Sequence, residues 1–120
     1  MPKKIEILNN GVILADNAEY CKDIFSKTRG LMFRKKLKQG QGLILVADEE
    51  SIYETTIHMF FVFFPIDVVW LNKDKKVVDL KCNVKSFQPL IAPREPAKYV
   101  LELPVGASKN IKLGDKLDFV

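Results

Sequence analysis

Only a few residues of this sequence carry groups that could bind a polar ligand or move a proton, and they lie far apart along the chain. A carboxylate beside an imidazole can act as an acid–base pair, and the rigid fork of an arginine can hold an anion or a buried carboxylate. We therefore take five residues as ligand-binding candidates: Arg29, Arg34, His58, Asp67 and Glu102. None is assigned a catalytic role, and whether the protein is an enzyme stays open.

Asp67 lies in the most apolar stretch of the chain, Ile57–Leu71, in which twelve of the fifteen residues are apolar. On a strand it would have apolar neighbours on both faces, which predicts burial. A buried carboxylate needs a partner. Asp67 therefore either binds Arg29 or Arg34, or accepts hydrogen bonds from backbone amides at a bend made by Pro65. The alternative is a site carboxylate that lines a pocket.

The other two candidates also have a structural and a functional interpretation. Glu102 alternates with apolar residues in a predicted strand, Tyr99–Leu103, so it could be the second acidic group of a site. His58 is the single histidine. It is either a core or rim residue or a general base.

The sequence offers little material for a metal site, a cofactor or a disulfide. Cys21 and Cys82 lie in unlike contexts, without metal-ligand spacing around them. A glycine-rich phosphate loop and a nucleophile elbow are both missing. We therefore expect no metal, no cofactor and no disulfide.

The elements that must position these residues are mostly strands. The turn Asn9-Asn10-Gly11 is a strong hairpin signal, and Cys21, Ile24, Phe25 and Thr28 recur at helical spacing, which predicts a helix over Asn17–Thr28. Strands are predicted on both sides of the turn and in five later segments: Lys4–Leu8, Val12–Leu14, Leu43–Val46, Ile57–Leu71 (bent or divided at Pro65), Lys76–Val84, Tyr99–Leu103 and Lys116–Val120. The prediction is one domain over residues 1–120, mainly β, an antiparallel β-sandwich or barrel with one short helix packed at one side.

Composition narrows the class of partner. The net charge is +4, but only 3 of the 19 basic residues are arginine, and the aromatic residues lie in runs that are typical of a core. We therefore do not expect nucleic acid as a partner. The stretch Ile57–Leu71 is too short to span a bilayer, and the N-terminus has no apolar leader. A cytoplasmic protein without a membrane partner is the prediction.

The segment Arg29–Arg34, which reads Arg-Gly-Leu-Met-Phe-Arg, resembles the signature of an uncharacterised family, domain of unknown function 192. The resemblance continues through Gly42–Val46, Pro65–Asp67 and Tyr99–Leu103, and ends at Gly106 and Gly114-Asp115. It implies a small β-sandwich or barrel and no known activity. Many bacterial members resemble Phe-Trp-Met-Lys-Asn-Thr where this chain has Ile57–Val62, so any chemistry of that Lys-Asn pair is absent or different here.

Three hypotheses follow. The site of the first would lie at one end of the barrel, between Arg29–Lys38, His58 and the proline-rich loop Ser86–Pro96. The first is a non-catalytic module that binds a small molecule or a protein partner. The second is an enzyme acting on a small sugar-like substrate, with Asp67 or Glu102 and His58 as an acid–base pair. The third is a basic accessory module for nucleic acid or another anionic partner. The ligand and the oligomeric state are not predicted.

Overall fold

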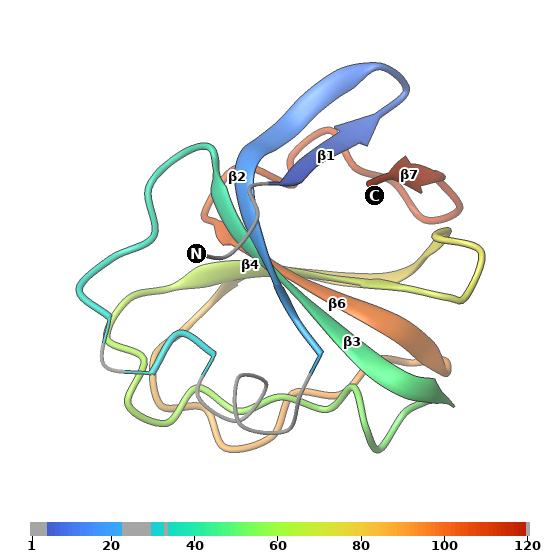
Figure 1. The fold of residues 1–120 in the computed structure, drawn as a ribbon. Coiled ribbons are helices and arrows are strands. Elements are labelled where there is room, and N and C mark those ends of the chain that lie inside the picture. The colour runs from blue at the N-terminus through green and yellow to red at the C-terminus, as the bar shows by residue number, and fades with distance from the viewer. Residues whose placement is uncertain (1–4, 23–29, 33, 120) are drawn as a thin grey trace.

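Seven strands form one strongly curved sheet (Figure 1). The computed structural model describes residues 5–22, 30–32 and 34–119. The strands are β1 Ile5–Asn9, β2 Val12–Cys21, β3 Gln41–Ser51, β4 Ile66–Leu71, β5 Val77–Val84, β6 Ala97–Pro104 and β7 Leu117–Asp118. The predicted mainly β fold is thus confirmed.

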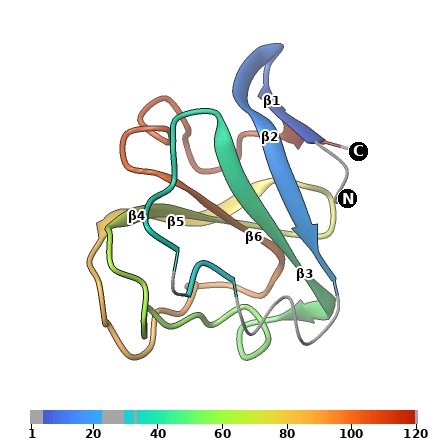
Figure 2. The same ribbon diagram turned by 60° about the vertical axis from the view of Figure 1, so that its left-hand side comes forward.

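The sheet has the strand order β5-β4-β6-β3-β2-β1-β7. β2 and β3 run parallel, and the other neighbouring pairs are antiparallel. The two edges approach each other, because the amide of Leu117 donates to the carbonyl of Lys75 (2.9 Å) and the amide of Val77 donates to Asp115 (2.8 Å). The sheet is therefore a curled half-barrel, as Figure 2 shows from the side.

The hairpin predicted at Asn9-Asn10-Gly11 is present, and a second hairpin joins β4 and β5. Asn10 and Gly11 take positive φ angles of 52° and 80° between β1 and β2, the conformation of a two-residue type I′ turn. Between β4 and β5, the side-chain oxygen of Asn72 accepts the amides of Asp74 (2.9 Å) and Lys76 (3.0 Å). Turn chemistry thus sets the register of both hairpins.

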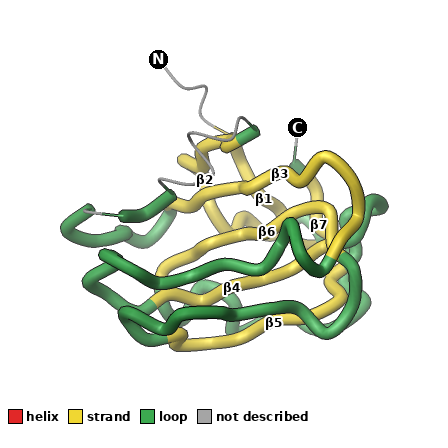
Figure 3. The backbone as a smooth tube through the Cα atoms, turned by 90° about the horizontal axis from the view of Figure 1, so that it is seen from below, coloured by secondary structure: helices red, strands yellow, loops and turns green. Residues whose placement is uncertain are grey.

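The helix predicted over Asn17–Thr28 is wrong in its first part. Residues 17–21 belong to β2 and pair with residues 41–45 of β3; residues 23–28 lie outside the described residues, and the described part of the chain contains no helix (Figure 3). Ala15 and Ala18 are buried three residues apart because they face Ile7 and Ile5 across a register shift. The helical spacing rested on Cys21, Ile24, Phe25 and Thr28, and of these only Cys21 lies within the described residues, at the end of β2.

The prediction of strand structure throughout Ile57–Leu71 is also wrong in its first half. β4 begins at Ile66, and its six residues are all buried. Before it, Ile57 makes one isolated bridge to Ile91, and residues 58–65 form a loop. Within that loop Phe61 has a positive φ of 59°. The apolar run therefore divides into a core strand and an irregular covering segment.

Two faces of the central strands β3, β6 and β4 carry separate apolar clusters. On β6, Val100 and Glu102 belong to one face and Leu101 and Leu103 to the other. The Val100 side is covered by residues 31 and 32 and by the segment 57–64, whose course over the strands is visible in Figure 3. The other side packs against β1, β7 and Ile111. We call these the Glu102 face and the Asp67 face.

Within the described residues, no helix is long and apolar enough to cross a membrane.

Candidate functional site

A cavity of about 460 Å³ lies between the Glu102 face and the segments that cover it. Leu45, Val100 and Glu102 contribute to it from strands β3 and β6. The covering segments contribute apolar and polar groups: Gly30, Leu31, Met32, Thr55, Thr56, Ile57, His58, Met59 and Val62. Asp48 and Glu54 also line it. A largely apolar cavity with a few polar groups is the usual form of a small-molecule site.

Glu102 is the ionisable group that strand geometry holds in this cavity. It lies between Leu43 of β3 and Val68 of β4 in the paired register and is only 6% exposed. Burial raises the pKa of its carboxyl from 4.5 to about 7, and the Arg34 guanidinium opposes this with a smaller lowering effect. Among the described residues, no hydrogen-bond donor contacts this carboxyl. Glu102 can therefore gain or lose a proton near neutral pH inside an apolar cavity.

Arg34 lies near Glu102 but does not line the cavity. Its Nη2 atom forms an ion pair of 2.8 Å with Glu19 on β2, and both side chains are partly exposed. Its influence on Glu102 is thus electrostatic, and its charge is already shared with another carboxylate. Arg29, the other predicted arginine, lies outside the described residues.

His58 lines the cavity from the covering segment. Its Nδ1 atom accepts the backbone amide of Phe60 at 3.1 Å, and its ring lies 5.2 Å from the Phe60 ring. In the neutral imidazole the proton is then on Nε2. His58 can donate a hydrogen bond from Nε2, but Nδ1 is occupied and cannot take a proton without losing its backbone contact.

Asp67 lies on the other face of the sheet and does not line the cavity. It is 1% exposed. Its Oδ1 accepts the amide of Asn83 (2.9 Å), and its Oδ2 accepts the amides of Gly106 (3.0 Å) and Ser108 (3.2 Å) and the Ser108 hydroxyl (2.6 Å). These bonds hold the turn after β6 against β4 and β5. Asp67 is thus bound by amides, at this turn and not at the Pro65 bend.

The predicted arginine partner of Asp67 is wrong for Arg34, which pairs with Glu19. The prediction that Asp67 and Glu102 could share a site fails for a geometric reason. Asp67 faces Leu103 across the β4–β6 ladder and Glu102 faces Val68, one residue out of step. Neighbouring residues of a strand point to opposite faces, so the sheet separates the two carboxylates.

The predicted position of the ligand site, at one end of the barrel, agrees only in part with the position of the cavity. The cavity includes the beginning of the predicted 29–38 segment and His58, but the loop Ser86–Pro96 does not line it. That loop instead supports the covering segment, through bonds of 2.9 and 2.8 Å between Ile57 and Ile91 and of 2.8 Å from the Met59 amide to Gln88. The loop thus contacts the residues Ile57 and Met59 that line the cavity, without lining the cavity itself.

Several polar residues of the structure were missed by the sequence reasoning. Asp48 and Glu54 line the cavity and are joined, since Glu54 Oε2 accepts the Asp48 amide at 2.9 Å. Buried Trp70 donates from Nε1 to the Thr55 carbonyl at 2.8 Å and so anchors that wall. Asp48 and Glu54 lie in what reads as a polar turn, and only the fold brings them to Glu102. Among the described residues, no group of three metal-binding side chains comes together.

Comparison with known proteins places the chain in a family of undetermined function. The profile of DUF192, described as "Uncharacterized ACR", matches residues 5–119. A "UPF0127 protein" of Pyrococcus abyssi is 35% identical over 106 residues, which is 85% of each chain. Another, from Thermococcus sibiricus, is 31% identical over 91% of this chain and 70% of its own.

Two solved structures share the fold. One is a protein of unknown function from Novosphingobium aromaticivorans, with a TM-score of 0.84 and 22% identity over 95% of this chain and 82% of its own. The other, from Sinorhizobium meliloti, is described as a "putative transcription regulator" and has a TM-score of 0.83 and 23% identity over 96% of this chain and 91% of its own. At these identities the likeness establishes the fold alone.

Proposed function

The chain belongs to the uncharacterised DUF192 family, and we propose that it is a non-catalytic module that binds a small amphipathic molecule in the cavity at Glu102. The observation that carries this proposal is the titratable Glu102 carboxyl inside an apolar cavity. Leu31, Met59 and Val62 would receive the apolar body of the ligand. The carboxyl would receive its polar end, because a buried charge gains most from a partner that replaces the lost water.

The charge of the cavity favours a ligand with a cationic or hydrogen-bond-donating end. Three acidic residues line the cavity, Asp48, Glu54 and Glu102, and no lysine or arginine among the described residues does. A protonated amine on an apolar chain fits this arrangement. It would bind Glu102 in its ionised form, so its affinity should rise as the pH increases through about 7.

The test is a thermal-shift titration with primary alkylamines from hexylamine to decylamine, against the matching alcohols and carboxylates. We expect the amines to raise the melting temperature more at pH 8 than at pH 6, and the carboxylates to have no effect. Glu102→Gln should weaken amine binding about tenfold, the loss of roughly one charge-assisted hydrogen bond. The exposed Glu49→Gln is the matched control. Equal responses to amines and carboxylates, or no effect of Glu102→Gln, would refute the proposal.

A second candidate is an enzyme that uses Glu102 and His58 as an acid–base pair on a sugar-like substrate. It is supported by one observation, that both side chains line the same cavity. The occupied Nδ1 of His58 favours binding over turnover, since it leaves the imidazole only as a donor. Release of nitrophenol from a panel of nitrophenyl glycosides, lost in both Glu102→Gln and His58→Gln, would replace the first proposal by this one.

A further inference from the structure

Five large apolar side chains are exposed on two loops beside the cavity, 58–65 and 85–92. They are Phe60, Phe61, Phe63, Phe87 and Leu90, with exposed fractions of 44%, 47%, 56%, 48% and 78%. We call this set the aromatic surface. None of its residues lines the cavity. Their exposure has to be explained separately, because apolar groups gathered at one place on a surface usually mark an interaction site.

The aromatic surface is continuous across the two loops. The Phe87 ring lies 5.5 Å from the Phe63 ring and 6.4 Å from the Phe61 ring, both at edge-to-face angles. The loops are joined below the rings, because the amide of Phe87 donates to the carbonyl of Met59 at 2.8 Å. The rings of Phe61, Phe63 and Phe87 are thus carried by two loops that are hydrogen-bonded to each other.

Two of these phenylalanines have an unfavourable backbone conformation. Phe61 and Phe87 have positive φ angles of 59° and 65°, a region in which a bulky residue is strained. The same segment directs Met59 and Val62 into the core. Asparagine or glycine would fit both strained positions better. Local backbone preference therefore does not account for phenylalanine at these two positions.

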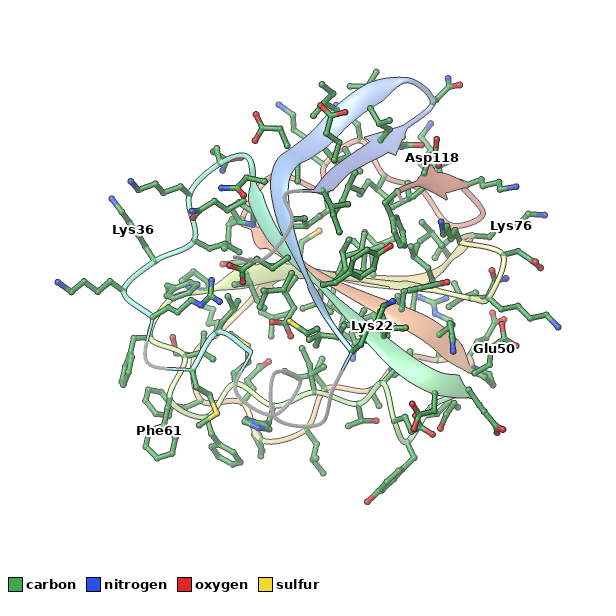
Figure 4. The ribbon with its side chains drawn as sticks, in the orientation of Figure 1. Lys22, Lys36, Glu50, Phe61, Lys76 and Asp118 are labelled. Carbon is green, nitrogen blue, oxygen red and sulfur yellow. The ribbon has the colours of Figure 1, made fainter. Side chains whose placement is uncertain are left out.

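The two loops that carry the aromatic surface, and the segment 30–40, are basic in sequence. Residues 30–40, 55–66 and 80–93 include no aspartate or glutamate, but they carry the exposed lysines Lys35, Lys36, Lys38 and Lys85. Figure 4 shows Phe61 and Lys36 on one side of the molecule and Glu50 and Asp118 on the opposite side. One side of the protein therefore combines exposed rings with positive charge.

We propose that the aromatic surface docks on an anionic lipid bilayer. The phenylalanine rings would enter the boundary between headgroups and acyl chains, and the lysines would contact the headgroup phosphates. Charge complementarity favours lipid over a second copy of this chain, whose matching surface would carry the same positive charge. The proposal departs from our expectation of no membrane partner, which rested on the stretch Ile57–Leu71 being too short to span a bilayer.

The test is co-sedimentation of the whole chain with vesicles of equal parts phosphatidylcholine and phosphatidylglycerol, and with vesicles of phosphatidylcholine alone. We expect binding to the anionic vesicles only, and weaker binding at high salt. The variant Phe61→Asn/Phe63→Ser/Phe87→Asn should lose at least about tenfold in affinity. Its melting temperature should be unchanged or higher, since two strained positions are relieved. The variant Lys35→Gln/Lys36→Gln should lose affinity for the anionic vesicles by a similar factor.

The matched control is Tyr53→Ser, which removes an aromatic ring that is 89% exposed beside the acidic residues Asp48–Glu50. It should leave vesicle binding unchanged. Absence of binding to anionic vesicles would overturn the proposal. So would binding that the phenylalanine variant retains in full, because charge alone would then explain it. Self-association abolished by the same variant, without vesicle binding, would identify the surface as an interface between copies.

Discussion

Two of the three buried carboxylates among the described residues of the sheet, Asp67 and Glu102, show how differently one fold can treat the same chemical group. Asp67 on one face accepts three backbone amides and a hydroxyl. Glu102, on the neighbouring strand and the other face, has no such donor among the described residues and opens into a cavity. Asp67 is thus held by hydrogen bonds within the protein, whereas Glu102 has no hydrogen-bond donor among the described residues.

The comparison teaches that burial alone does not distinguish a structural carboxylate from a site carboxylate. Both side chains are almost fully buried. What differs is the supply of hydrogen-bond donors, which stabilise a buried charge. Burial raises the pKa of the Glu102 carboxyl to about 7, and no donor among the described residues offsets it. The binding proposal depends on this property.

The largest effect should come from Asp67→Asn. An amide cannot offer acceptor atoms on both sides, so at least one buried N–H loses its partner and the remaining bonds lose their charge. We expect a loss of about 4 kcal/mol in the free energy of unfolding, measured by urea denaturation. The exposed Asp118→Asn is the control and should change it by less than about 0.5 kcal/mol. An unchanged stability of Asp67→Asn would show that Asp67 is not structural.

Glu102→Gln should have the next largest effect on the free energy of unfolding, and it should raise this free energy where Asp67→Asn lowers it. The pKa of Glu102 is higher in the folded protein than its ordinary value of 4.5. Its contribution to stability is therefore complete below pH 4.5 and is lost as the pH rises to about 7. The difference between these pKa values corresponds to about 3 kcal/mol. Glutamine carries no charge, so the Glu102→Gln variant does not lose this stability as the pH rises.

Glu102→Gln should accordingly be more stable than the original chain at pH 8, by up to about 3 kcal/mol, and similar to it near pH 4.5. Urea denaturation of both proteins across this range measures the difference, and other titrating groups cancel because they are common to both. A difference that does not change with pH would remove the contrast with Asp67.

The smallest effect should come from Ser108→Ala. It removes the hydroxyl that donates to Asp67 Oδ2 at 2.6 Å but leaves the three amide donors in place. We expect the free energy of unfolding to fall by about 1–2 kcal/mol. This loss should not show the pH dependence predicted for Glu102→Gln. In the Asp67→Asn background the loss should be smaller, because the two residues share one network. Equal losses in both backgrounds would mean that Ser108 acts elsewhere.

Much of the fold could be predicted because local chemistry determines it. Asn10-Gly11 requires a tight hairpin, and the alternation in Tyr99–Leu103 identifies a strand. The errors came from features that depend on distant partners. The segment Asn17–Cys21 was assigned to a helix but pairs with residues 41–45 of β3, and Phe60, Phe61 and Phe63 have core composition in a loop that the core does not cover.

The candidate site was predictable only in its parts. Alternation in its strand pointed to Glu102, and the apolar stretch Ile57–Leu71 drew attention to His58 and Asp67. The face on which each carboxylate lies depends on the register between β4 and β6, which the sequence does not reveal. Asp48 and Glu54 reach the cavity only through folding of a segment that looks like an ordinary polar turn.

The central claim, that Glu102 is a buried carboxyl left free to titrate, is tested most directly by an NMR titration of its carboxyl carbon. The signal is assigned by its disappearance in Glu102→Gln. The account predicts a midpoint of about 7, moving to lower pH when a bound alkylamine supplies the missing partner. A midpoint near 4.5 in the unbound protein would contradict it.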